Sequence, residues 1–364
     1  MSALALHDSH ARWGGTLGSV HGCEVVCHYG DVAAEHGALS QAAAALDLSL
    51  RTRLVVMGAD RDRFLNGQVT NDLRRLEVGQ GCYAAIVNAR GKMDGDAGIY
   101  RLPEEWLLDC EPGLTGALSS RLERHGVAED VRILDATPHY GLLSVQGPKA
   151  AEVIRRLLPD LLLPPAPYTF ASFKHPAWGE AYCMNQPRVG RPGYDLYLPV
   201  VGLASAAVEL DAAVRAVGGR WAGWEALETA RIEAGIPRFG ADMDNTTLPP
   251  EAGIESRAIS YAKGCYLGQE VIARIRTYGQ VARTLRGLRW THPTAPLPEP
   301  GDPLLHGAQV VGKITSATRS PVLDAPIALG YVRRECQAIG TQLEVRSAGG
   351  GNTVEIVPLP FLTP

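Results

Sequence analysis

The chain has 364 residues, of which 46% are hydrophobic and 20% are charged, and its formal net charge is −4. This length is too great for one ordinary core and predicts two or three domains. The small negative charge excludes a protein whose whole surface binds nucleic acid, and no run of roughly eighteen apolar residues is present to span a membrane.

The first residues lack a basic region followed by an apolar core, the pattern of a signal peptide, so we expect a cytoplasmic protein. The seven cysteines are an odd number and lack the spacing of a secreted disulfide framework. They therefore favour free thiols in a reducing compartment.

Residues 1–50 join glycine-rich, partly alternating sequence to an alanine-rich stretch. That stretch predicts a helix over 32–46, with Asp31 as its N-cap. Cys23 and Cys27 lie near histidines, which suggests a metal site. In a strand, however, the two cysteines would be held about 13 Å apart, too far to share an ion, so we predict no metal site.

The region 51–139 predicts strands around short helices. The runs with strand character are 53–59, 82–88, 95–102 and 106–110. A turn is expected at 89–92, and Asp60 is placed to begin a short helix. This mixture is typical of an α+β domain.

The same mixture recurs over 140–250, whereas the last part of the chain has only short strand-like runs between glycine turns. Such runs favour a small antiparallel barrel. We therefore expect a discontinuous α+β domain, a second α+β domain, a signature loop with a connector, and a C-terminal β-barrel. Their respective boundaries are 1–50 with 140–250, 51–139, 251–290, and 291–364.

One short stretch contains a candidate reactive thiol, Cys265, between two glycines. Glycines allow a tight turn or the close approach of a ligand, and a lysine two residues before a thiol can favour the thiolate. The alternative is that Cys265 is a small apolar filler, as free cysteines often are. The stretch reads Lys263, Gly264, Cys265, Tyr266, Leu267, Gly268, Gln269, Glu270.

These eight residues resemble the K-G-C-[YF]-x-G-Q-[DE] signature of the YgfZ family. Its members are folate-binding relatives of the glycine-cleavage T-protein that assist iron-sulfur cluster assembly or repair. The resemblance implies that Cys265 is the working thiol, that Lys263 raises its thiolate fraction, and that Gln269 and Glu270 fix the loop by hydrogen bonds. One cysteine cannot hold a cluster, which typically needs about four protein ligands, so iron-sulfur assembly proteins or client enzymes are the implied partners.

A second candidate site lies on the strand around Asp96. Period two places Asp94, Asp96, Gly98 and Tyr100 on one face, where a flat heterocycle could lie with Tyr100 packed on its plane. The alternative is a solvent-facing strand with two ordinary aspartates. The run 88–100 resembles the stretch of aminomethyltransferases whose aspartate meets the reactive edge of tetrahydrofolate. The resemblance implies this role for Asp96 and a place in the pterin pocket for Tyr83.

Three further positions follow from the same resemblance. Asp195 ends a glycine-rich turn where aminomethyltransferases have a glutamate that holds the pterin; the alternative is an ordinary surface aspartate. Arg231 belongs to an R-x-E-A-G helix end and is expected at the folate site. Leu227 stands where aminomethyltransferases have an arginine that contacts folate, and this departure favours the YgfZ family.

Five arginines follow the cysteine motif, and they suggest either a solvated strand face or an anchor for a folate polyglutamate tail or an acidic partner. They are Arg274, Arg276, Arg283, Arg286 and Arg289. Near the end, 311–321 and 328–332 resemble strands of the superfamily's barrel. The resemblance thus extends over about 40–345. It implies an α+β fold with three domains in a T-protein-like ring and tetrahydrofolate, or a folate derivative, as the cofactor.

The favoured interpretation is a tetrahydrofolate-binding, YgfZ-like protein that assists iron-sulfur cluster assembly or repair through Cys265. One alternative is a folate-dependent aminomethyltransferase of the T-protein type. Another is a tRNA-modification factor, although nucleic acid is the less favoured partner. The sequence leaves open whether the protein is an enzyme.

Overall fold

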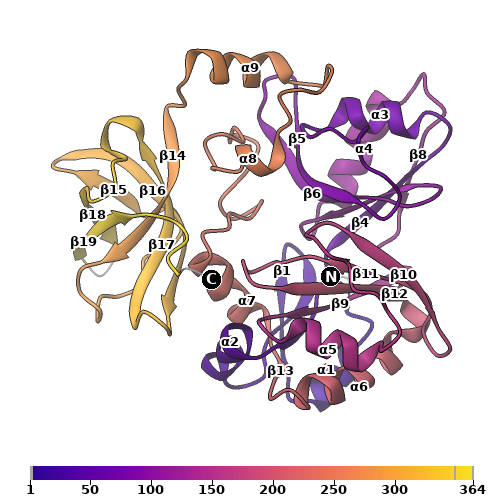
Figure 1. The fold of residues 1–364 in the computed structure, drawn as a ribbon. Helices are drawn as coiled ribbons and strands as arrows, with labels where there is room; N and C mark the ends of the chain where they lie inside the picture. Colours follow the sequence, from indigo (N-terminus) through magenta and orange to yellow (C-terminus); the bar gives the residue numbers. More distant parts are fainter. Residues whose placement is uncertain (1–2, 348–349, 363–364) are drawn as a thin grey trace. The chain divides into compact units, whose positions relative to one another are not determined.

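The computed structural model describes residues 3–347 and 350–362 (Figure 1). The chain divides into two compact units. The first unit comprises the chain up to Ile86 together with 95–227 and 262–266. The second comprises 87–94, 228–261 and the chain from Leu267 onward. None of the helices in the described ranges combines the length and the apolar character needed to cross a bilayer.

The first unit contains a six-stranded sheet that is antiparallel except for one parallel pair at its edge. In spatial order its strands are β10 (Phe170–His175), β11 (Gly179–Asn185), β12 (Gly193–Pro199), β9 (Tyr140–Gln146), β3 (Ala44–Asp47) and β13 (Arg220–Trp221). Helices α5 (Ala150–Leu157) and α6 (Val200–Arg215) pack on it through a shared apolar core. On α6, Leu203, Ala207, Leu210 and Val214 are buried at helical spacing.

The N-terminal part of this unit adds a hairpin and two helices. They are α1 (His7–Arg12), β1 (Thr16–Val20), β2 (Cys23–His28) and α2 (Val32–Gln41). Asp31 caps α2, since its side chain accepts a hydrogen bond of 2.9 Å from Ala34 N. The helix predicted over 32–46 is too long, because the next alanines enter β3 and are completely buried in the sheet.

The first unit also contains most of a five-stranded sheet in the order β5-β6-β7-β4-β8. The strands are β4 (Thr52–Met57), β5 (Gly81–Val87), β6 (Met93–Arg101), β7 (Trp106–Cys110) and β8 (Arg132–Asp135). Helices α3 (Arg61–Gln68) and α4 (Thr115–His125) share one apolar core with the sheet through Phe64, Leu65, Leu118 and Leu122. Strand alternation predicted four of these five strands from sequence to within a few residues.

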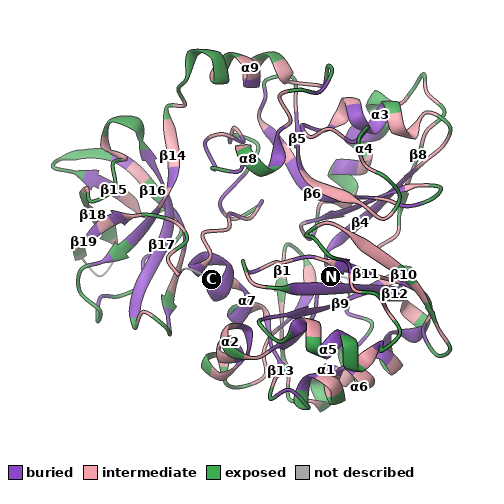
Figure 2. Ribbon diagram, in the orientation of Figure 1, coloured by how far each residue is buried: buried purple, intermediate pink, exposed green. Residues whose placement is uncertain are grey.

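The second unit is dominated by a closed antiparallel barrel. Around the barrel its strands are β14 (Arg283–Trp290), β17 (Ala325–Arg333), β16 (Gln309–Ser320), β15 (Pro303–His306), β18 (Gln342–Ser347) and β19 (Gly350–Val357). Figure 2 shows β17 buried along nearly its whole length. The α+β class and the C-terminal antiparallel barrel predicted from sequence are confirmed.

The remaining helices are short. They are α7 (Trp224–Glu233), α8 (Glu255–Ala258), α9 (Gln269–Tyr278) and the 3-10 helix η1 (Arg334–Cys336). Strand β14 lies inside the stretch 251–290 that was predicted to be a loop and connector. The proline-rich stretch at 291–303 therefore joins two barrel strands instead of preceding the barrel, because β14 closes the barrel against β19.

Candidate functional site

A carboxylate and a phenol meet on neighbouring strands of the five-stranded sheet. Tyr83 lies on β5 and Asp96 on the adjacent β6, and the Tyr83 hydroxyl donates a hydrogen bond of 2.6 Å to Asp96 Oδ2. Asp96 is only 7% exposed. On the other face of β6, Ala97 and Ile99 enter the apolar core. The structure therefore excludes a solvent-facing strand with ordinary aspartates.

Tyr100 lies on the same strand but has a packing role. Its side chain is completely buried, and its hydroxyl donates a hydrogen bond of 3.2 Å to Gln186 Oε1. The ring centroid lies 6.1 Å from that of Phe170, edge to face, and 6.4 Å from that of Tyr168. Because no face of the ring is open to a ligand, the structure corrects the prediction that Tyr100 packs on a heterocycle.

Asp195 on β12 is completely buried, so it is not a surface aspartate. Its Oδ2 accepts hydrogen bonds from Arg188 Nε at 2.9 Å and Arg188 Nη2 at 2.6 Å. Arg188 Nη2 also lies 2.8 Å from Asp109 Oδ2, and Arg51 Nε lies 2.8 Å from Asp109 Oδ1. These four residues, called the charge network below, alternate in sign between the two sheets of the first unit.

The two carboxylates of the charge network differ in the number of cations they contact. Burial alone would raise the pKa of Asp109, but Arg188 and Arg51 lower it to about 2. Burial raises the pKa of Asp195 above its usual value, because Arg188 compensates only part of the cost. Arg188 occupies Asp195 Oδ2, whereas Asp195 Oδ1 is buried without a hydrogen-bond partner among the described residues. That Asp195 holds a pterin therefore stays a prediction.

Two predicted positions on helix α7 offer no donor to a ligand. Leu227 is buried and aliphatic. Arg231, 4% exposed, donates to Asp242 Oδ2 at 2.5 Å and to Ser316 Oγ at 2.7 Å, and it also pairs with Glu228 at 2.9 Å. Burial would lower the pKa of Arg231, but the two carboxylates raise it above the usual value. The prediction that Arg231 binds folate is corrected: its donors stabilise the second unit.

In the loop at 263–266, two exposed residues lie between two buried ones. Lys263 and Tyr266 are buried at 5% and 9% exposure, whereas Gly264 and Cys265 are exposed. The interpretation of Cys265 as a buried apolar filler is therefore excluded, because Cys265 is exposed to solvent.

Lys263 does not direct its ammonium at the thiol. The Nζ donates hydrogen bonds to Asn66 O at 2.6 Å, Val69 O at 2.7 Å and Asn71 O at 2.6 Å. Burial lowers the pKa of Lys263 to about 8, and nearby Asp72 partly opposes this. Within the described chain, no hydrogen bond or ion pair joins Lys263 to Cys265. These contacts therefore do not support the predicted role of Lys263 in raising the thiolate fraction of Cys265.

The end of the motif begins helix α9. Gly268 has φ +82° and precedes the helix, and a Cβ there would lie 2.4 Å from Asn88 O, so only glycine fits. Gln269 and Glu270 form the first turn of α9, and neither side chain makes a hydrogen bond to any residue the structure describes. The predicted hydrogen bonds from Gln269 and Glu270 are therefore corrected, since the backbone of Gly268 fixes this turn.

The five arginines after the motif do not form one strand face. Arg276 stacks over Tyr261 at 3.9 Å from the ring centroid, and Arg283 stacks over Tyr331 at 4.6 Å. Arg286 donates to Gln337 O at 3.1 Å. Arg274 and Arg289 are exposed. Because three of the five guanidinium groups contact their own chain, the run gives little support to an RNA-binding surface.

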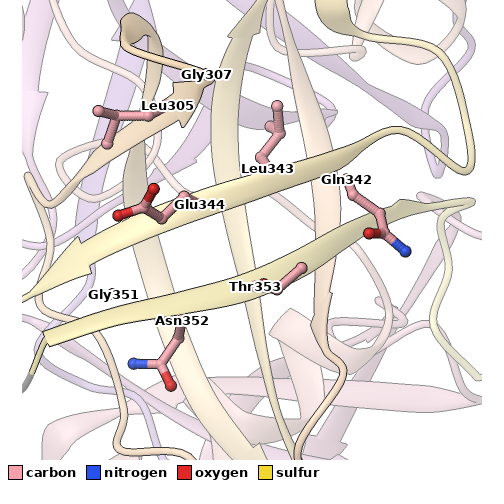
Figure 3. Close-up of a pocket in the computed structure, with 8 residues that line it drawn as sticks. All are labelled: Leu305, Gly307, Gln342, Leu343, Glu344, Gly351, Asn352 and Thr353. Carbon is pink, nitrogen blue, oxygen red and sulfur yellow. The ribbon is translucent and has the colours of Figure 1, made fainter.

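Two cavities lie away from both candidate sites. One of about 460 Å³ in the first unit is lined by residues that include Ser49, Thr52 and Tyr140. The other, of about 330 Å³, opens on β15, β18 and β19 of the barrel, where Figure 3 shows Glu344 and Asn352 among its lining residues. Neither cavity is lined by Asp96 or Cys265. Within the described residues, no three His, Cys, Asp or Glu side chains are placed to bind a metal ion.

The sequence prediction missed the partners of its own candidates. Arg188, Arg51 and Asp242 were not singled out, although each is buried against a charge of opposite sign. A usable signal was present at Asp109. It is a charged residue inside the otherwise apolar run 106–110, which predicts a buried cation as its partner.

The chain is similar to known proteins over nearly its whole length. A family model described as the GCVT N-terminal domain matches residues 6–263, and one described as the glycine cleavage T-protein C-terminal barrel domain matches residues 283–362. An aminomethyltransferase of Rubrobacter xylanophilus is 30% identical over 98% of this chain and 93% of that protein. An aminomethyltransferase of Symbiobacterium thermophilum is 29% identical over 98% of this chain and 96% of that protein.

A solved structure has the same fold. It is the crystal structure of glycine cleavage system aminomethyltransferase T from Bartonella henselae, with a TM-score of 0.88 and 23% sequence identity. The likeness covers 99% of this chain and 98% of that chain.

Proposed function

The chain belongs to the glycine cleavage T-protein family, and from that premise we propose that it binds tetrahydrofolate and transfers a one-carbon unit to it from an aminomethylated carrier. The observation that carries the proposal is the Asp96 carboxylate, which accepts a hydrogen bond of 2.6 Å from the Tyr83 hydroxyl on a strand that resembles the folate-binding stretch of aminomethyltransferases. The names of the relatives favour this reaction over the iron-sulfur role suggested by the cysteine motif.

The predicted folate contacts fit a pterin only in part. Asp96 and Tyr83 fit, because a nearly buried carboxylate oriented by a phenol accepts a hydrogen bond from a ring N–H donor. Tyr100 and Arg231 have other partners, and Asp195 is paired with Arg188. Asp96 is therefore the main ligand-binding residue in this proposal. Its carboxylate binds the reactive edge of the pterin ring and accepts a proton from it.

The test is the formation of methylenetetrahydrofolate, with release of ammonia and of the carrier thiol, from tetrahydrofolate and a lipoylated carrier protein loaded with an aminomethyl group. Wild-type protein should turn over, and Asp96→Asn should lower the rate by about 100-fold or more, since a positioned proton acceptor typically contributes that much. Arg215→Met, which removes an exposed arginine on α6, is the matched control and should leave the rate unchanged. Absence of turnover by the wild type, or full activity of Asp96→Asn, would reject the proposal.

A second candidate function is supported by the exposed thiol. Cys265 is exposed to solvent, and aminomethyl transfer through Asp96 gives the thiol no role. An accessible thiol is what the resemblance of the cysteine motif requires for assistance to iron-sulfur enzymes, with assembly proteins or clients supplying the other ligands. Cys265→Ala should then abolish rescue of cluster-enzyme activity in a deficient strain while leaving methylenetetrahydrofolate formation intact. Full rescue by Cys265→Ala would remove this candidate.

A further inference from the structure

The side chain of Lys263 ends beside the end of a helix. The last carbonyls of a helix have no partner within it, and α3 ends at Gln68. Asn66 O belongs to the last turn of α3, and Val69 O and Asn71 O follow it directly. The ammonium has three N–H donors and meets all three oxygens at 2.6–2.7 Å. A positive charge at this end of the helix is also electrostatically favourable.

The segment held by Lys263 leads to the Tyr83–Asp96 pair. Asn71, whose carbonyl accepts from Lys263, donates from its side-chain Nδ2 to Tyr83 O at 2.9 Å. The Tyr83 hydroxyl in turn donates to Asp96 Oδ2. Asn71 and the backbone of Tyr83 therefore link the ammonium to the phenol that orients Asp96, the candidate folate-binding residue.

The backbone of Lys263 leads in the other direction to the exposed thiol. Cys265 is two residues away, and the buried ring of Tyr266 lies beyond it with its centroid 5.0 Å from Lys263 Nζ. The ammonium thus contacts both the 66–71 segment and the aromatic residue that closes the loop. Arg74 is exposed and paired with Asp72, and its Nη1 lies 3.9 Å from the position that a Cβ on Gly264 would take.

We propose that Lys263 is a positioning residue that holds the Tyr83–Asp96 pair and the Cys265 loop in one fixed arrangement. It acts through backbone carbonyls and through Asn71, and it contacts neither the thiol nor the carboxylate. The part of the proposal that concerns ligand affinity rests on the proposed function, whereas the part that concerns the loop stands on the contacts alone.

Three variants of the full chain test this proposal. Lys263→Met removes the donors and keeps most of the apolar stem. Asn71→Ala breaks the link to Tyr83 and leaves the ammonium in place. Arg74→Met is the matched control, because it removes a cation near the loop that has no carbonyl partners of this kind. The measurements are hydrogen exchange resolved to short peptides and the Kd for 5-formyltetrahydrofolate.

Lys263→Met should speed exchange of the amides in 66–73 and 262–267 by about tenfold and weaken 5-formyltetrahydrofolate binding by about tenfold, as expected for lost hydrogen bonds to a charged donor. Asn71→Ala should weaken binding but leave exchange at 262–267 unchanged. Arg74→Met should change neither quantity by more than about twofold.

The proposal is overturned if Lys263→Met behaves like Arg74→Met, or if it speeds exchange equally throughout the six-stranded sheet, which would indicate a general loss of stability. If Lys263→Met does not fold, Asn71→Ala decides, and an unchanged Kd would overturn the link to Asp96. If the wild type binds no 5-formyltetrahydrofolate, the proposed function fails, while the exchange measurement still decides whether Lys263 fixes the loop.

Discussion

Asp96 and Asp195 were predicted to do the same work, and the structure gives them different surroundings. Asp96 retains slight exposure and is oriented by the neutral phenol of Tyr83, whereas Asp195 is completely buried against the guanidinium of Arg188. A carboxylate paired with a guanidinium has its charge neutralised, whereas a phenol donates a hydrogen bond to a carboxylate without adding a positive charge. A carboxylate assigned to a ligand site by resemblance can therefore have a structural role instead, depending on the side chain that it contacts.

The same contrast separates structural stability from ligand binding. The charge network joins the two sheets of the first unit, so its loss should affect folding. The Tyr83–Asp96 pair lies at the candidate ligand site, so its loss should affect folate binding and turnover. Each prediction below changes one side of this comparison.

The largest effect is expected from Arg188→Met. It leaves Asp109 with one cation and Asp195 with none in a buried setting, which typically costs about 3–5 kcal/mol. The free energy of unfolding, measured by urea denaturation, should fall by this amount. Arg215→Met removes an exposed arginine paired with Asp211 and serves as control, with an expected loss of about 0.5 kcal/mol or less. Equal stability of the two variants would show that the charge network contributes nothing.

The pH dependence of stability should have opposite signs for the two carboxylates bound to Arg188. The pKa of Asp109 is lowered to about 2, so its stabilising contribution is complete above pH 3.8 and is lost as the pH falls toward 2. The pKa of Asp195 is raised, so the folded state takes up this proton first and gains stability as the pH falls toward 3.8. Each effect amounts to at most about 1.4 kcal/mol per pH unit.

The measurement compares the wild type with Asp109→Asn and with Asp195→Asn by urea unfolding at several pH values between 7 and 3. The wild type should lose stability relative to Asp109→Asn below pH 4. It should gain stability relative to Asp195→Asn between neutral pH and pH 4. Slopes of the same sign would mean that the two carboxylates share one environment, contrary to the structure.

Tyr83→Phe tests the candidate ligand site at Asp96. It removes the 2.6 Å hydrogen bond to Asp96 but keeps the ring. Loss of one hydrogen bond to a charged group is worth about 1.5 kcal/mol or more, so the rate of methylenetetrahydrofolate formation should fall by about tenfold. The free energy of unfolding should fall by about 1.5 kcal/mol, less than the loss expected for Arg188→Met. An unchanged rate would show that the phenol does not orient the carboxylate.

The smallest effect on the fold is expected from Cys265→Ala. The thiol is exposed and belongs to neither carboxylate site, so the midpoint of urea unfolding and the rate of folate turnover should both match the wild type. Cys110→Ser, which places a hydroxyl at a completely buried position of β7, is the contrasting control and should destabilise clearly. A marked loss of stability in Cys265→Ala would mean that the loop is packed more tightly than the structure shows.

The sequence predicted local structure well where alternation or capping specifies it. The strands 95–102 and 106–110 are strands in the structure, and Asp31 caps the helix that follows it. The helix at 32–46 was predicted too long, because alanine suits both a helix and a buried strand, and burial in the sheet decides at 44–47.

The sites were harder to predict, because their partners come from distant parts of the chain. Asp96 and its phenol lie 13 residues apart on adjacent strands, a distance that strand pairing makes predictable. Lys263 binds carbonyls nearly 200 residues away, and backbone oxygens carry no residue type that could identify them in the sequence. Asp195 was assigned by resemblance, which fixes the carboxylate but not the arginine beside it.

The most direct test of the account is a calorimetric titration of tetrahydrofolate into the wild type, Asp96→Asn and Asp195→Asn. We expect the wild type to bind, Asp96→Asn to bind at least about tenfold more weakly, and Asp195→Asn to stay within about threefold of the wild type. Weak binding by Asp195→Asn together with normal binding by Asp96→Asn would contradict the account, because the carboxylate paired with Arg188 would then be the one that holds the ligand.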